Sequence, residues 1–287
     1  NAILQDDNLA DICSVELYGA DGQPEQEALA DAIEDWQCGD IDIVVCLPMK
    51  LSARKALREH LPEEMADVVM LHINETIAMA SVMGAASAAD AAAKIKTEDV
   101  KSVVQKVAKA LKRDLFVLNP RVAVMSMNEN IVADEASKEF SVIAPAVSEL
   151  VKEGVQTFGP LPYKTFFESP TVKAYDAVVA MYDEQCETMH RELCTEDTVM
   201  LASGLSVPMV FAEPESLLKA FFVAIDAWRN REEYDYPAKN PLPKLYHERK
   251  EDGDKARFAV KKKGFNPAEH RRENVTFTTA KTPAPQE

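Results

Sequence analysis

Short apolar runs alternate with helical patterns along most of this chain, and this alternation limits the fold more than any other feature. Strand-like runs occupy residues 41–47, 68–73, 76–83, 121–127, 155–158, 176–181 and 207–211. Helical spacing of apolar residues occupies 26–36, 52–60, 97–115, 134–153 and 213–231. Such alternation is typical of an α/β fold with a largely parallel or mixed sheet. We therefore expect ligands to bind at the turns that follow the carboxyl ends of the strands.

The segment 176–185, Asp-Ala-Val-Val-Ala-Met-Tyr-Asp-Glu-Gln, is the most informative of these strand ends. It predicts a buried strand that opens directly into an acidic turn. Asp183, Glu184 and Gln185 are therefore candidate site residues. Lys50, which follows the apolar run 41–47, is a further candidate acid or base.

Composition excludes several classes of function. The net charge is −16; residues 237–287 hold 12 basic and 7 acidic side chains, whereas residues 1–236 hold 20 and 41. The acidic body disfavours nucleic acid and anionic membrane as partners, and the basic tail fits an acidic partner or a solvated terminus. No apolar run is long enough to span a membrane, and no secretory signal is visible. Five cysteines without a Cys-x-x-Cys pair favour reduced thiols in the cytoplasm, with Cys46 as a core residue.

Common phosphate-binding and nucleophile motifs are absent. The chain has only nine glycines and contains no Gly-x-Gly-x-x-Gly, P-loop or Gly-x-Ser-x-Gly sequence. Ser203 and Gly204 are nevertheless candidates for contact with a cofactor. Four potential ligands share one helical face, namely Asp183, Glu187, His190 and Cys194. That spacing suits some metal sites, but a solvated helix face or a dimer seam explains it equally well.

Several motifs, in order, resemble those of one enzyme family. These are Gly39-Asp-Ile-Asp-Ile-Val-Val45 with Pro48 and Lys50, Asn119-Pro-Arg-Val-Ala-Val124, Gly159-Pro-Leu-Pro162, and the segment 176–185. Together they resemble the 4-hydroxythreonine-4-phosphate dehydrogenase (PdxA-like) family of pyridoxal phosphate synthesis. The resemblance extends over residues 2–248 and assigns residues 7–13 and 17–19 to the family's first helix and second strand.

The resemblance implies two α/β domains with a cleft between them, as in isocitrate and isopropylmalate dehydrogenases, and a homodimer. We expect a first domain from residues 1–55 plus 213–245, a second from 56–212, and a basic extended tail at 246–287. Members of the family bind a divalent metal through three histidines, and NAD accepts a hydride from the substrate alcohol. An active member would therefore require NAD and Mg²⁺, Mn²⁺ or Zn²⁺, and would take a small phosphorylated ligand.

This chain departs from the family at the metal ligands. Ala85 and Asn130 stand at two of the histidine positions, and the family's third histidine motif has no counterpart. Asp183 stands where the family has histidine in Tyr-His-Asp-Gln, and the family's phosphate-binding loop is missing from residues 59–66. Alanine has no ligand atom and asparagine is a poor ligand for a transition metal. We therefore expect a catalytically degenerate member that acts by binding, scaffolding or regulation.

Two alternatives remain open. In the first, Asp183, Glu184, Glu129 and Asn130 form a relocated metal site, whose oxygen ligands would suit Mg²⁺ or Mn²⁺ better than Zn²⁺. In the second, Lys50, Glu129, Asp183 and Glu184 serve an enzyme of another class.

A homodimer is expected under all of these readings. The resemblance places the partner against residues 193–209. Met200, Leu201, Met209 and Phe211 make this region too apolar for an exposed surface.

Overall fold

The computed structural model describes residues 13–19, 22–47, 67–74, 77–83, 88–129, 131, 137–193 and 198–240. The chain divides into two units, Asn1–Pro237 and Ala238–Glu287, and only residues 238–240 of the second unit are described. The predicted division into domains at residues 1–55 plus 213–245, 56–212 and 246–287 stays a prediction.

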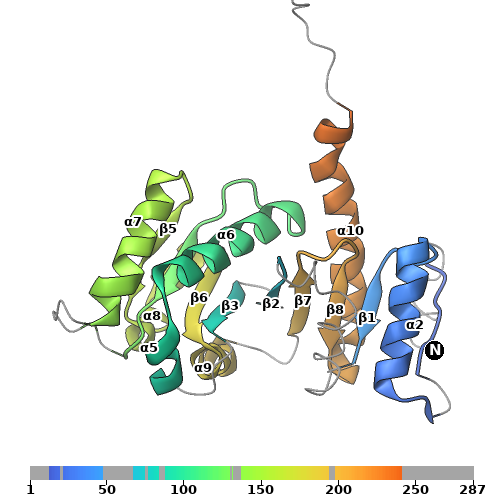
Figure 1. Cartoon of the computed structure of the whole chain (residues 1–287), viewed down its shortest axis with the longest axis horizontal. Helices are drawn as coiled ribbons and strands as arrows, with labels where there is room; N and C mark the ends of the chain where they lie inside the picture. The colour runs from blue at the N-terminus through green and yellow to red at the C-terminus, as the bar shows by residue number, and fades with distance from the viewer. Residues whose placement is uncertain are drawn as a thin grey trace, which may run out of the picture. The chain divides into compact units, whose positions relative to one another are not determined.

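One mixed sheet of eight strands organises the first unit (Figure 1), which confirms the expected α/β class. The strand order is β1-β8-β7-β2-β3-β6-β4-β5. The strands are β1 Val44–Cys46, β2 Val69–Ile73, β3 Ala78–Met83, β4 Val122–Met125, β5 Thr157–Leu161, β6 Ala177–Tyr182, β7 Val199–Ser203 and β8 Met209–Ala212. Strands β3, β6, β4 and β5 are mutually parallel, whereas β2 is antiparallel to both β3 and β7.

Side chains of the central strands alternate between two apolar layers, as expected for strands that are covered on both faces. In β6, Val179 and Met181 face one layer, and Val178 and Ala180 face the other. Helices α6 Thr97–Arg113, α7 Ala144–Lys152 and α10 Leu217–Lys239 cover the first face. Helices α8 Tyr163–Phe166 and α9 Asp183–Leu193 cover the second face, where α2 Glu25–Cys38 packs on β1, β7 and β8. The remaining elements are α5 Ala88–Lys94, the π turn η3 Glu139–Ile143, and the 3₁₀ turns η4 Pro170–Ala174 and η5 Pro214–Ser216.

Most of the predicted elements exist, with shifted ends. The hairpin of β2 and β3 is confirmed, and so are the helices at 26–36, 97–115 and 213–231. Lys96 holds the N-cap position of α6, and the Asp99 carboxylate accepts a hydrogen bond from the Lys96 backbone N–H at 3.0 Å. Strand β5 continues through Gly159 to Leu161 rather than ending at residue 158.

The sequence patterns misassign two other segments. Strand β7, the apolar run Val199–Ser203, was not predicted, although it pairs with β2 and β8. Residues 17–19 form no strand, whereas the resemblance places the family's second strand there. The predicted helix at 52–60 lies outside the described residues.

The apolar residues that were taken as signs of a dimer surface are covered within one chain. Leu201 and Met209 are 0% exposed and Phe211 is 3% exposed, because they lie on β7 and β8 inside the sheet. Their hydrophobicity therefore needs no second copy, and that argument for a dimer was wrong. The homodimer itself stays a prediction.

The Cys46 thiol lies on β1, and burial raises its pKa to about 12, so it is protonated at neutral pH.

No helix in the described part of the chain has the length and hydrophobicity that crossing a membrane requires.

Gly204, in the turn between β7 and β8, cannot be replaced without strain. Its φ is +109°, and an added Cβ would lie 2.4 Å from the carbonyl oxygen of Asp67. We predict that Gly204→Ala lowers the free energy of unfolding by about 2–4 kcal/mol. Gly154 is the matched control, because its φ is +85° but a Cβ would meet no atom within 4 Å. Gly154→Ala should cost about 1 kcal/mol, and equal losses in urea denaturation would contradict the assigned clash.

Candidate site at the strand ends

Parallel pairing brings the carboxyl ends of β3, β6 and β4 to the same edge of the sheet. Met83 pairs with Tyr182 at the ends of β3 and β6, and Val124 pairs with Val179 between β4 and β6. The turn 126–129 after β4 and the start of α9 after β6 therefore lie at the same edge of the sheet. This is the edge at which α/β proteins bind ligands.

Asp183 begins α9 immediately after β6, and its carboxylate forms a hydrogen bond with another side chain of the same protein. Its Oδ1 accepts a hydrogen bond from the Ser81 hydroxyl of β3. The pair joins neighbouring strands at the position where the family has a histidine. Ser81 was not predicted as a site residue; its only sequence signal is a hydroxyl near the end of an apolar strand.

Gln185 is buried, 2% exposed, and connects β6 to β4. Its Oε1 accepts from the Met181 backbone N–H at 2.8 Å, and its Nε2 donates to the Ser126 carbonyl at 2.8 Å. Both ends of the amide are thus satisfied by backbone. The structure gives this candidate residue a positional role in holding the two strand ends together.

The other two acidic candidates lie at the surface of the site. Glu129 is paired with Lys164 of α8 at 3.2 Å, with both side chains more than half exposed. Glu184 is exposed on the first turn of α9. Burial raises the pKa of the Tyr182 phenol, and the negative charges of Glu184 and Glu129 raise it further. The charges of both carboxylates therefore act on the Tyr182 hydroxyl.

The described donors do not fit a divalent metal held in the manner of the family. No set of three or more His, Cys, Asp or Glu side chains in the described residues is arranged to hold a metal ion. Asp183 is bonded to Ser81, and Glu129 is paired with Lys164. Lys50, Ala85, Asn130 and Cys194 lie outside the described residues, as does the side chain of His190.

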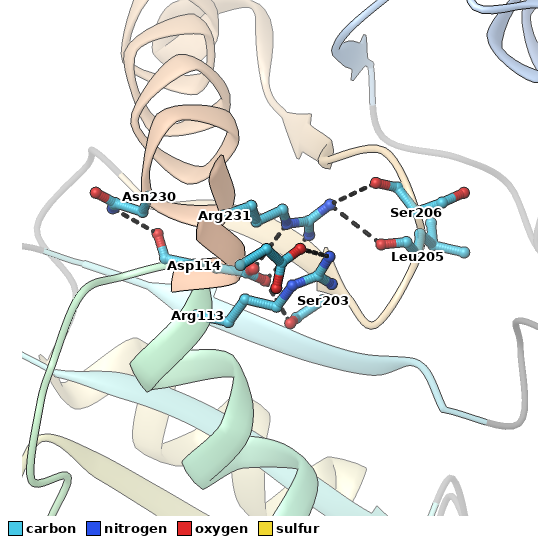
Figure 2. Close-up of polar contacts among 8 residues, drawn as sticks. Arg113, Asp114, Ser203, Leu205, Ser206, Asn230 and Arg231 are labelled. Atoms are coloured by element: carbon cyan, nitrogen blue, oxygen red, sulfur yellow. Dashed lines mark hydrogen bonds and ion pairs between the residues drawn. The ribbon is translucent and has the colours of Figure 1, made fainter. Parts of the chain in front are cut away.

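The strongest buried polar cluster is elsewhere, at the end of α6 (Figure 2). Asp114 is completely buried and accepts from Nε and Nη2 of Arg231, on α10, at 2.7 and 3.1 Å. Arg231 Nη1 also donates to the carbonyls of Leu205 and Ser206, at 3.1 and 3.4 Å. This two-pronged contact suits the planar guanidinium.

One of the two candidate cofactor residues, Ser203, belongs to this cluster. The Ser203 hydroxyl donates to Asp114 Oδ2 and is buried. Gly204 lies against the backbone of Asp67. Both residues are therefore explained by contacts inside the protein. Asp114 and Arg231 were missed as a pair because 117 positions separate them.

Fold and site together define a class: a mixed α/β protein with polar side chains at the carboxyl ends of parallel strands, as in many dehydrogenases. A family model described as "Pyridoxal phosphate biosynthetic protein PdxA" matches residues 8–212. The chain belongs to this PdxA family, which confirms the resemblance.

Individual relatives agree with this assignment. A 4-hydroxythreonine-4-phosphate dehydrogenase from Bacteroides thetaiotaomicron is 27% identical over 80% of this chain and 71% of its own. One from Xanthomonas axonopodis pv. citri is 33% identical over 38% of this chain and 35% of its own. A solved structure titled as a putative enzyme of that name, from Salmonella typhimurium, has a TM-score of 0.58 at 22% identity, covering 70% of this chain and 69% of its own. A second, from Klebsiella pneumoniae, has a TM-score of 0.55 at 23% identity, covering 72% and 68%. The two structures support the fold.

The buried ion pair should be essential for stability. Arg231→Met leaves the Asp114 carboxylate buried without its main partner, and we predict a loss of about 3–5 kcal/mol in unfolding free energy. Arg113→Met is the matched control, because Arg113 contacts Asp235 at 3.5 Å in a partly exposed pair and should cost at most about 1 kcal/mol. Chemical denaturation measures both. Similar losses for the two variants would refute the importance of burial.

Gln185 provides a test of the strand-end frame. Gln185→Ala removes both hydrogen bonds and leaves the Met181 N–H and the Ser126 carbonyl unsatisfied, so we expect a loss of about 2–4 kcal/mol. Glu184→Ala, at the exposed neighbouring position, should change stability by less than about 0.5 kcal/mol. Thermal unfolding that ranks the two variants the other way would contradict the structural role of Gln185.

Proposed function

We propose that this chain is a non-catalytic member of the PdxA family that acts through binding, as a scaffold or regulatory protein. The single observation that carries the proposal is the Ser81–Asp183 hydrogen bond, which engages one carboxylate oxygen of Asp183 at a strand end where the family has a histidine. The sequence supports the same conclusion, since Ala85 has no ligand atom at a second such position and Asn130 replaces a third.

The family's reaction depends on a metal that polarises the substrate oxygen. At the positions that match the family's histidines, this chain has Ala85, Asn130 and Asp183 instead. The acidic groups at the strand ends are better suited to internal hydrogen bonds and surface pairs. Glu129 illustrates this, because Lys164 already contacts its carboxylate. The relocated metal site would need Asp183, Glu184, Glu129 and Asn130 together. Asn130 lies outside the described residues, and no contact among the other three favours such a site. A homodimer, a small phosphorylated ligand and an acidic partner for the basic tail are further proposals that rest on the sequence.

The test is a turnover assay with a working relative as reference. The full chain and the Bacteroides thetaiotaomicron enzyme are incubated with NAD and 4-phosphohydroxythreonine in the presence of Mg²⁺, Mn²⁺ or Zn²⁺. NADH is followed by its absorbance. We expect formation with the relative and none above the protein-free rate with this chain.

Asp183→Asn serves as the control for residual activity, because it keeps a side chain that can still accept from Ser81. NADH formation by the unmodified chain that Asp183→Asn abolishes would overturn the proposal, because it would assign Asp183 to a working site. A chain that is inactive but shifts its melting temperature with NAD alone would retain binding and agree with the proposal.

A further inference from the structure

Glu139 is a buried carboxylate with two hydrogen bonds on one oxygen and, among the described residues, none on the other. The residue is 1% exposed and lies on the π turn η3. Its Oε1 accepts two hydrogen bonds from Asn128, from the backbone N–H and from the side-chain amide, each at 3.0 Å. Its Oε2 is buried, and no partner for it is found among the described residues. Carboxylates are rarely buried without full pairing, so this position needs an explanation.

The backbone around Glu139 is unusual for a reason that the sequence supplies. Pro145 has no N–H, and its ring would collide with the carbonyl four residues earlier in a regular helix. The chain widens instead into a π turn, in which the Ala144 N–H bonds the Glu139 carbonyl five residues back. Single π turns inside helices occur often at functional sites. Here the turn places Glu139 beside the loop that follows β4.

Asn128 is linked onward to the strand-end site. Its carbonyl accepts from the Ser126 hydroxyl at 2.5 Å, and the Ser126 carbonyl accepts from Gln185. Glu139 is therefore the outer member of a continuous chain of hydrogen bonds that reaches the end of β6. Asn128, which donates both hydrogen bonds to Glu139, is followed directly by Glu129, whose carboxylate contacts Lys164.

We propose that Glu139 is a positioning residue of the strand-end site: its carboxylate fixes the path of the turn 126–129 and so places Glu129 and the residues that follow β4. The role of this positioning in ligand binding rests on the binding function proposed above. Glu139 lies outside the first turn of α9, which holds residues 183–185, and it acts through Asn128 rather than by touching a ligand. Because the backbone N–H and the side-chain amide of Asn128 both donate to Glu139, a shift of Asn128 would break both hydrogen bonds.

The test uses hydrogen exchange on the full chain without NAD, metal or substrate, so it is independent of the assay for catalysis. Glu139→Ala removes the acceptor, and we expect exchange of the Asn128 amide to speed up about tenfold or more. Glu139→Gln keeps an amide oxygen that can accept from Asn128, so it should hold exchange within about threefold of the unmodified chain. Glu149→Gln is the matched control, since Glu149 contacts Lys101 at the surface of α7.

The reference segment is α6, which reports the stability of the whole first unit. Faster exchange confined to residues 126–129 in Glu139→Ala, restored in Glu139→Gln, supports the proposal. Equal acceleration in α6 would show that Glu139 only stabilises the fold, and it would overturn the positioning role. So would an unchanged Asn128 amide in Glu139→Ala, or a Glu139→Gln variant that behaves like the alanine variant.

Discussion

The parallel pairing of β3, β6 and β4 is the constraint on which the rest of the site depends. Pairing of Met83 with Tyr182 fixes where β3 and β6 end relative to each other. Because the side chains of both strands are buried on both faces, a slip of one residue would move each apolar group to the other layer. The register is therefore firmly set, and with it the relative positions of Ser81, Asp183 and the turn after β4.

That frame places polar groups at the carboxyl ends of the strands, and several of them form hydrogen bonds within the chain. Ser81 donates to Asp183, Gln185 bonds two backbone groups, and Glu139 accepts from Asn128. A cation site needs ligand atoms that can turn toward the metal, whereas the Gln185 amide and one oxygen each of Asp183 and Glu139 already have partners. In the Asp114–Arg231 cluster, a fully buried carboxylate is stabilised by the Arg231 guanidinium and the Ser203 hydroxyl. The Asn230 side-chain amide donates to the backbone carbonyl of Asp114.

Sequence patterns predicted the α/β class, the family and most elements, because apolar periodicity and motif order are local properties. They located Asp183, Glu184 and Gln185 at a strand end, and the structure agrees. They did not distinguish the roles of these residues, since Gln185 is buried and Glu184 is exposed one position away. They also missed Ser81, Glu139 and Arg231, whose partners lie between 11 and 117 positions away. Strand β7 was missed because two of its residues, Met200 and Leu201, were interpreted as part of an apolar dimer surface.

The metal content of the purified protein tests most directly the central proposal, that this chain does not hold a catalytic cation. The purified chain is incubated with Zn²⁺, Mn²⁺ or Mg²⁺, passed through a desalting column and measured by inductively coupled plasma mass spectrometry. We predict far less than one equivalent of any divalent metal per chain. One equivalent that survives desalting and disappears in Asp183→Ala would contradict the account.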